Sequence, residues 1–431
     1  MNHAERREME SILIDRGLQN STESPDLEIV HTCSVTGQAA AKSRNAIRRA
    51  KRNGKHVFVT GCFTGTDMEV AQELGDTIIT HSGETPMIER FAQQIDTWLE
   101  RPHEPTKEKT TSLPIATLPT IPGAHTRAEL RIQDGCDAHC TFCIIPKIRT
   151  TLRSKTVEDT VVEATRLVEL GHKEIIFTGI FIGAYGHETA LRRKQDSPDS
   201  EYLADLLDAV AQIDGLKRLR ISSMEPGDVT PVLLDAMAAN NKVVVPHLHL
   251  PLQSGSDTVL RKMNRQYNIS QYMKMIMLVN ERLTIDGLPP AITTDIICGF
   301  PTETEVDFEK TVTIAKQVGY LHMHIFPYSV RTGTAAARWN ILPPKVVQER
   351  VQTLLQLDGE LSLAYRTRLK GHTIKVMIEQ PAELAGQMKG RCEHYAEISL
   401  PTEAAIGSIV EAKVMQVESD KTVAMPSLQI L

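Results

Sequence analysis

The stretch "IQDGCDAHCTFCIIP" (residues 132–146) holds three of the chain's seven cysteines, namely Cys136, Cys140 and Cys143. Thiolates are soft ligands that suit zinc, copper(I) and iron–sulfur clusters. A structural zinc site takes four ligands, usually from paired C-x2-C hooks. This stretch offers three cysteines, and His139 is too close to Cys140 in the chain to bind the same ion well. Three thiolates suit a four-iron cluster with one iron open to a further ligand. A structural zinc loop is the alternative.

The whole composition is that of a folded globular protein. The chain has 431 residues, of which 41% are hydrophobic and 24% are charged, so we expect two to four domains with a full-sized core. The net charge of −6 does not suggest a nucleic-acid-binding protein. Any contact with nucleic acid must therefore depend on local basic patches.

The N-terminal stretch "MNHAERREME" is charged and lacks the apolar core of a secretory signal. No apolar run of about 18 residues is present that would span a bilayer. We therefore expect a cytoplasmic protein without membrane association, in which thiols stay reduced. Clustered cysteines in such a protein indicate metal binding rather than disulfides.

Residues 1–100 alternate helical patterns with short apolar runs that are typical of strands buried on both faces. The predicted strands are 27–30, 57–60 and 77–80. This order predicts a small doubly wound α/β domain. Residues 101–126 contain five prolines together with Ser, Thr and Lys, which predicts an exposed linker.

Residues 127–366 follow a longer α/β rhythm. The predicted strands are 129–133, 174–179, 218–223, 243–250, 291–298 and 322–328, with helical patterns between most of them. Six β/α units are too few for a closed eight-stranded barrel, so we expect an open, partial (β/α)6 barrel. Residues that carry out the chemistry of such folds lie at the carboxyl ends of the strands.

A long helical pattern leads out of the barrel, and residues 367–431 then change to apolar residues at every second position. This pattern predicts a small all-β barrel. The expected fold class is therefore α/β, with an N-terminal doubly wound domain, a central partial barrel and a C-terminal β-barrel.

The three cysteines of the opening stretch, with Phe142 before the last one, resemble the signature of radical S-adenosylmethionine enzymes. The resemblance implies that Cys136, Cys140 and Cys143 bind a [4Fe-4S] cluster whose open iron binds the methionine part of S-adenosylmethionine. It also implies that reductive cleavage yields a 5′-deoxyadenosyl radical, which abstracts hydrogen from an unreactive C–H bond. The protein's part is placement, redox tuning and exclusion of water.

The flanking stretches resemble the methylthiotransferase branch of that superfamily over essentially the whole chain. "VHTCSVTGQ" (30–38) and "VFVTGCFTG" (57–65) place Cys33 and Cys62 just after predicted strands. In the family, three N-terminal cysteines bind an auxiliary [4Fe-4S] cluster involved in sulfur delivery, and the last domain is an RNA-binding, TRAM-like barrel. "HIFPYSVRTGTAAA" (324–337) is most similar to the branch that adds a methylthio group to C2 of N6-threonylcarbamoyladenosine, next to the anticodon of tRNA.

One part of the family pattern is incomplete. "MNHAERRE" (1–8) resembles the end of the family's G-C-x-x-N-x-x-E stretch, with Asn2 and Glu5 at the Asn and Glu positions but without the first cysteine. We expect that the true start lies upstream. A real loss of the ligand is the alternative and would put sulfur insertion in question. Under the family reading the partners are a tRNA substrate, a reductant protein and a sulfur donor, and a monomer is expected.

The resemblance also supplies candidate cofactor-binding residues near the predicted strand ends. They are Phe142, Thr178, Gly179, Ser223, Glu225, Gln253 and Asp295. Barrel packing or strand-end capping is the alternative for each of them. His247, His249, His322 and His324 alternate along two predicted strands. We interpret these as structural histidines with satisfied hydrogen bonds.

Basic residues indicate where RNA contacts are expected. Residues 42–55 contain seven basic side chains and no acidic one, and a basic face binds phosphates through counterion release. A solvated helix face is the alternative. The candidates are Arg44, Arg48, Arg49 and Arg52, with Lys389 and Arg391 in the last domain, where His394 and Tyr395 add ring surfaces for stacking.

Three other functions remain open. The same chemistry could act on isopentenyladenosine in tRNA, or on an aspartate of a ribosomal protein. A non-catalytic iron–sulfur protein that binds RNA is the alternative from another class, and it predicts no cleavage of S-adenosylmethionine.

Overall fold

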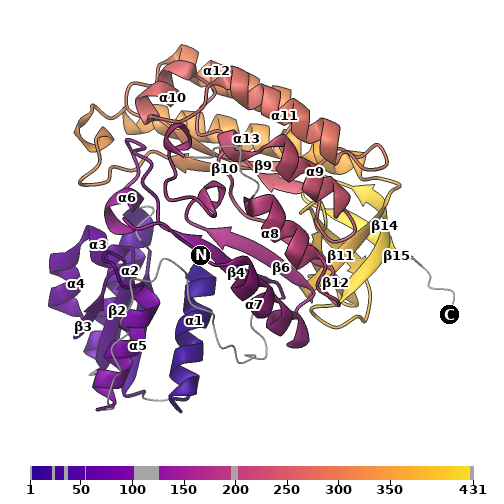
Figure 1. Cartoon of the computed structure of the whole chain (residues 1–431). Coiled ribbons are helices and arrows are strands. Elements are labelled where there is room, and N and C mark those ends of the chain that lie inside the picture. The colour runs from indigo at the N-terminus through magenta and orange to yellow at the C-terminus, as the bar shows by residue number, and fades with distance from the viewer. Residues whose placement is uncertain are drawn as a thin grey trace.

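The computed structural model describes residues 2–21, 25–33, 37–53, 55–100, 126–195 and 202–427. An N-terminal α/β domain, a central half-barrel and a C-terminal β-barrel follow one another across the molecule (Figure 1). The predicted fold class is confirmed. Nearly all of the predicted linker lies outside the described residues. In the part of the chain that the structure describes, no helix is both long and apolar enough to cross a membrane.

The N-terminal domain has a parallel sheet in the order β1-β2-β3 with helices on both faces. Successive side chains of β2 point to opposite faces of the sheet, so the strand packs against helices on both sides. Val57 and Val59 pack with Ile47 on one face, whereas Phe58 packs with Phe91 on the other. The elements are α1 (Asn2–Asp15), β1 (Leu27–Thr32), α2 (Gly37–Arg52), β2 (His56–Gly61), α3 (Phe63–Thr66), α4 (Met68–Leu74), β3 (Thr77–Ile79) and α5 (Met87–Trp98).

The described residues of the central domain form six parallel strands in chain order, covered by helices on one side. The strands are β4 (Ala128–Asp134), β6 (Glu174–Gly179), β7 (Arg218–Ile221), β8 (His247–His249), β9 (Ala291–Cys298) and β10 (His322–Pro327). The helices are α6 (Ile145–Ile148), α7 (Val157–Glu169), α8 (Tyr202–Ala211), α9 (Pro231–Ala239), α10 (Asp257–Met263), α11 (Ile269–Leu283) and α12 (Glu305–Val318). Single bridges, Leu219 to Val244 and Ser223 to His249, join the two halves of this open barrel.

Two details of the barrel differ from the prediction. The strand predicted over 243–250 is reduced to β8, because Pro246 has no N–H to extend the ladder. A short antiparallel strand, β5 (Arg153–Ser154), pairs with the end of β4. It was not predicted because a two-residue strand has no periodicity.

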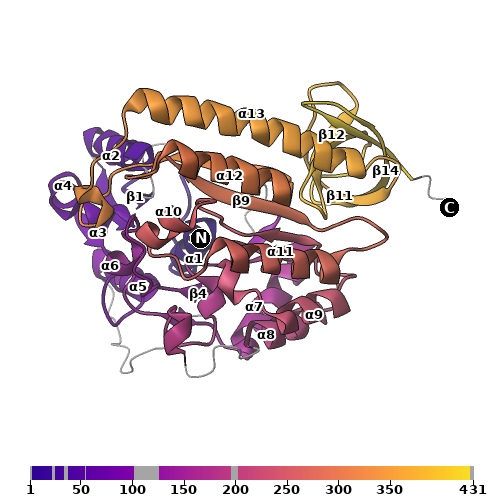
Figure 2. The ribbon, with the colours of Figure 1, turned by 90° about the horizontal axis from the view of Figure 1, so that it is seen from above.

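Helix α13 (Pro344–Arg368) runs along the central domain to the C-terminal barrel (Figure 2). That barrel is closed in the order β11-β12-β13-β15-β14, as the alternation predicted. Its strands are β11 (Thr373–Pro381), β12 (Gln387–Cys392), β13 (Glu397–Pro401), β14 (Ile409–Val417) and β15 (Thr422–Pro426).

The C-terminal barrel docks on the amino ends of the central strands. Arg218, the first residue of β7, donates to the carbonyl oxygens of Lys375 and of Arg391, the latter at 3.1 Å. His247, the first residue of β8, stacks on Tyr395 with ring centroids 4.6 Å apart. The carboxyl ends of the strands, where the cysteine stretch begins, lie at the opposite end of the barrel.

Candidate active site

The cysteine stretch forms a loop that follows β4 and is tied to neighbouring segments by backbone hydrogen bonds. Cys136 N donates to Arg149 O at 3.1 Å, and Thr141 N donates to Met263 O at 3.0 Å. Gly135 enters the loop with φ +83°, and a Cβ there would lie 2.1 Å from Thr151 O. Glycine is therefore required at the point where the strand turns into the loop.

The thiol of Cys140 lies close enough to Cys136 and Cys143 to oppose the ionisation of both. Burial raises the pKa of Cys136 to about 12. Burial and the neighbouring Cys140 raise the pKa of Cys143 to about 11. Three thiolates are stable here only with compensating positive charge, which iron ions provide. The donor set therefore fits the four-iron cluster that the sequence predicts.

A buried chain of ion pairs connects the loop to the end of β7. Arg265 Nη1 lies 3.2 Å from Cys140 Sγ, and the same guanidinium forms an ion pair with Glu225. Burial and the neighbouring Glu225 raise the pKa of Asp228 to about 7. Among the described residues, no hydrogen-bonding partner is present for Asp228 Oδ2. A buried carboxylate oxygen of this kind fits a cationic group of a bound ligand, such as an α-amino group.

A cavity of about 580 Å³ adjoins this corner of the loop. Its lining includes Ala138 and His139 of the loop, together with Arg192, Arg193 and Arg265. Three guanidinium groups beside one cavity favour an anionic molecule. The sequence analysis did not identify these arginines, because they come from separate segments without a shared motif.

The other predicted cofactor-binding residues lie on neighbouring strands or just beyond them, at different distances from the carboxyl ends of the strands. Thr178 and Gly179 end β6, and Gly179 approaches Gln133 so closely that a Cβ would lie 3.1 Å from its carbonyl oxygen. Gln253 has φ +58° and donates its N–H to Asp295 O at 2.8 Å. Ser223 bridges to His249. Contact of these residues with S-adenosylmethionine stays a prediction.

In the described part of the chain, two of the residues predicted to bind the cofactor, Phe142 and Asp295, do not line a pocket at the strand ends. Phe142 packs edge-on against Phe300, with centroids 6.3 Å apart, in an apolar cluster with Val259 and Met263. Asp295 lies within β9, directly opposite His324 of β10. Its side chain is 3.2 Å from His249, so this group contains two histidines that we interpreted only as structural.

Cys33 and Cys62 follow β1 and β2, as predicted, and the fold places them beside the cysteine loop. Cys62 is buried against Ile144 and Ile148 at the end of that loop. Its thiol influences the ionisation of Cys143, and Cys33 influences that of Cys62. Cys62 therefore lies beside the cysteine loop at the boundary between the domains.

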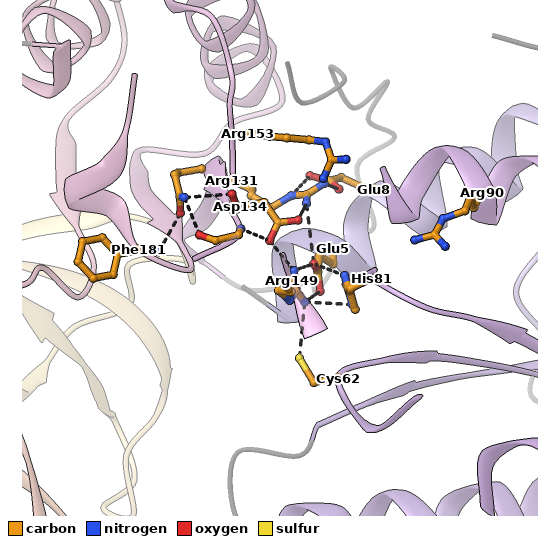
Figure 3. Close-up of polar contacts among 12 residues, drawn as sticks. Glu5, Glu8, Cys62, His81, Arg90, Arg131, Asp134, Arg149, Arg153 and Phe181 are labelled. Atoms are coloured by element: carbon orange, nitrogen blue, oxygen red, sulfur yellow. Dashed lines mark hydrogen bonds and ion pairs between the residues drawn. The ribbon is translucent and has the colours of Figure 1, made fainter. Parts of the chain in front are cut away.

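Arg149 is the buried link between these groups (Figure 3). Its guanidinium lies 2.6 Å from Glu5, 2.7 Å from Asp134 and 3.8 Å from Cys62 Sγ. Burial opposes ionisation of Glu5, but Arg149 and His81 hold the pKa of Glu5 well below its usual range. The sequence analysis identified Glu5 by its motif and did not identify Arg149.

Comparisons with known proteins agree with this geometry. Residues 130–315 match the model of the radical SAM superfamily, and residues 1–80 match that of uncharacterized protein family UPF0004. A Bacillus subtilis (strain 168) protein named threonylcarbamoyladenosine tRNA methylthiotransferase MtaB is 32% identical over 430 residues, covering 96% of this chain and 92% of the relative. The chain belongs to the radical S-adenosylmethionine methylthiotransferases that modify tRNA.

Relatives of more than one kind are found in this family. A Bartonella bacilliformis protein named tRNA-2-methylthio-N(6)-dimethylallyladenosine synthase is 32% identical, covering 94% of this chain and 89% of the relative. Among solved structures, the radical S-adenosylmethionine methyltransferase TsrM from Kitasatospora setae has a TM-score of 0.58 at 14% identity, covering 77% of this chain and 73% of that chain. At this identity, the likeness to TsrM shows the fold alone. Family membership implies S-adenosylmethionine and a [4Fe-4S] cluster as cofactors.

The residues predicted to contact RNA differ in how exposed the fold leaves them. Arg48, Arg49 and Arg52 are exposed on α2, whereas Arg44 lies 3.5 Å from Asp67. In the C-terminal barrel, Lys389 is half-buried near Glu397.

Arg391 and its ring-bearing neighbours lie at the docking surface. The Arg391 guanidinium packs 4.6 Å from the Tyr395 ring centroid, and the Tyr395 ring contacts His247. His394 is buried, with Nδ1 2.9 Å from Tyr365 Oη. The sequence predicted that these side chains form one RNA-facing loop. Instead, Tyr395 and His394 hold the C-terminal barrel to the central domain.

Proposed function

We propose that this enzyme adds a methylthio group to C2 of N6-threonylcarbamoyladenosine, next to the anticodon of tRNA. The observation that carries the reaction type is the position of Cys62 against the cysteine loop, because methylthio transfer needs a sulfur site beside the site of C–H activation. The choice of nucleoside is supported by the stretch 324–337 and by three relatives that bear this name, at 30 to 32% identity.

The chain's own residues have separable roles in this proposal. Cys136, Cys140 and Cys143 hold the radical cluster, and Arg265 fixes the side chain of Cys140 through its ion pair with Glu225. When bound, the cluster and S-adenosylmethionine supply radical chemistry for a C–H bond that is not acidic enough for a general base.

A second [4Fe-4S] cluster on Cys33, Cys62 and a third ligand is part of the proposal. Burial raises the pKa of Cys62, and the neighbouring Arg149 guanidinium offsets part of that rise. Iron and labile sulfide per chain, measured after anaerobic reconstitution, test this cluster on the present chain and on one extended upstream through any in-frame Gly-Cys codons. About eight irons in the extended form and about four here indicate two clusters and an upstream start. About four in both exclude the auxiliary cluster.

We also propose that a reductant protein and a separate sulfur donor serve the enzyme, and that it acts as a cytoplasmic monomer. These partners follow from the chemistry, which consumes electrons and sulfur.

Nucleoside analysis of tRNA tests the substrate. The reconstituted enzyme, reductant, sulfide and S-adenosylmethionine are incubated with tRNA that carries either threonylcarbamoyladenosine or isopentenyladenosine but no methylthio group. The expected result is the methylthio product in the first tRNA alone. Product in the second tRNA alone identifies the isopentenyladenosine branch. S-adenosylmethionine cleavage without product in either tRNA favours the ribosomal protein aspartate, and no cleavage favours the non-catalytic alternative.

A further inference from the structure

Three chemically complementary side chains meet on the inner face of the barrel, away from the cysteine loop. They are His249 on β8, Asp295 on β9 and His324 on β10, and their ligand atoms all lie within 4.8 Å of one another. The strand register brings them together, because His324 pairs with Asp295 and His249 pairs with Thr293, two residues earlier on the same face of β9.

This face of the sheet points away from the helices. Met323, between His322 and His324, is buried in the apolar core with Leu354 and Leu357 of α13. Successive side chains of a strand point to opposite faces, so His324 lies on the opposite face of β10 from Met323. On the face of His324, Asp358 of α13 reaches the side chain of the neighbouring His322 by a hydrogen bond. His324 is exposed, and His249 and Asp295 are partly buried.

Hydrogen bonds orient the imidazole of His249. Its Nδ1 lies 2.9 Å from Thr293 Oγ1, which also lies 3.1 Å from His247 Nε2. His249 Nε2 is consequently the atom that faces Asp295, with 3.2 Å between Nε2 and Oδ1. Metal-binding histidines commonly use their second ring nitrogen in this way, which fixes the ring orientation.

We infer that His249, Asp295 and His324 form a binding site for a divalent transition-metal ion. Two histidines and one carboxylate are a set of ligands typical of such ions. Ligand atoms about 2.0–2.2 Å from one tetrahedral zinc ion are separated by roughly 3.3–3.6 Å, and the 3.2 Å between His249 Nε2 and Asp295 Oδ1 is close to this separation. Three protein ligands leave a coordination position open toward the barrel interior, where a donor atom of an entering molecule can bind.

This assignment differs from the role in cofactor binding that the sequence suggested for Asp295, and it does not depend on which nucleoside is the substrate. His322 provides a matched control. It lies on the same face of β10, with its ring centroid 4.6 Å from that of His324. Its Nδ1 is engaged at 2.9 Å by Asp358.

The test uses the full chain with its clusters reconstituted, incubated with Zn²⁺ alone, desalted and analysed for zinc per chain. The variants are Asp295→Asn, His324→Ala and the control His322→Ala, and S-adenosylmethionine affinity is measured on each. Zinc held by cysteines is the same in all four proteins, so only differences between them count.

The expected result is one zinc equivalent fewer in Asp295→Asn and in His324→Ala than in the wild type and His322→Ala. Equal zinc in all four proteins overturns the site, as does a loss in only one of the two variants. Unchanged zinc together with weakened S-adenosylmethionine affinity in Asp295→Asn returns this residue to the cofactor site.

Discussion

Glu5 and Arg149 form a buried ion pair, with Glu5 Oε1 and Arg149 Nη1 2.6 Å apart, that joins the first helix of the N-terminal domain to the end of the cysteine loop. The Glu5 side chain is 0% exposed and that of Arg149 is 2% exposed. Arg149 O accepts from Cys136 N, and its guanidinium contacts Cys62. One residue thus connects both groups of cysteines.

Removing Arg149 should destabilise the N-terminal domain strongly. The variant Arg149→Met leaves the Glu5 carboxylate buried without its main partner, which costs roughly 3–5 kcal/mol. Urea unfolding, followed by fluorescence of Trp98 in a Trp339→Phe background, measures this cost. The control Arg6→Met breaks an exposed pair with Glu10 on the same helix and should cost less than about 1 kcal/mol. Equal costs for the two variants contradict the prediction.

Replacing one cysteine of the loop should abolish a single cluster. In Cys140→Ala, we expect the loss of about four irons per chain and of all S-adenosylmethionine cleavage. Iron analysis and detection of 5′-deoxyadenosine after anaerobic reconstitution check this. Cys298→Ala is the control, because Cys298 is a buried core thiol of β9 and its replacement should leave both quantities unchanged. Cleavage retained by Cys140→Ala refutes the ligand assignment.

Reversing two charges on α2 should weaken tRNA binding. Arg48 and Arg49 are exposed, and each phosphate contact that is lost lowers the slope of log K against log salt by roughly 1. We expect the double variant Arg48→Glu/Arg49→Glu to bind tRNA less tightly, with a shallower salt slope. Lys310→Glu/Lys316→Glu on α12 changes the net charge equally at exposed positions and is the control. The same slope in both variants means that α2 is only a solvated face.

Acidification should weaken the contact between the central domain and the C-terminal barrel, because it protonates His394. Burial lowers the pKa of His394 to about 4 from the usual 6.5. Between about pH 4 and pH 6.5 this histidine binds more protons in the unfolded chain than in the folded one. The contribution of neutral His394 to the free energy of unfolding is therefore fully present above about pH 6.5 and is lost as the pH decreases toward 4. The fall is at most about 1.4 kcal/mol per pH unit.

The variant His394→Gln keeps a polar partner for Tyr365 and removes this titration. Its unfolding midpoint in urea, measured from pH 7 to pH 5, should depend less on pH than that of the wild type. Parallel curves for the two proteins exclude His394 as the source.

Features that depend on neighbouring residues in the chain could be predicted from the sequence. The spacing of Cys136, Cys140 and Cys143 is short enough for one loop to present all three thiols. Two strands, 174–179 and 291–298, have the predicted bounds, because both are short stretches rich in apolar and β-branched residues. The alternation after residue 372 similarly predicted the closed β-barrel. Each signal lies within a few consecutive residues.

Only the tertiary structure showed which distant side chains are neighbours. Arg149 and Glu5 are 144 positions apart, and His249, Asp295 and His324 come from three different strands. Tyr395 and His394 looked like RNA-binding residues in the sequence, yet they pack in a domain interface. The physical reason is that strand register and domain docking depend on the packing of the whole chain. Local periodicity determines the elements, whereas this packing decides which charges and ligands meet.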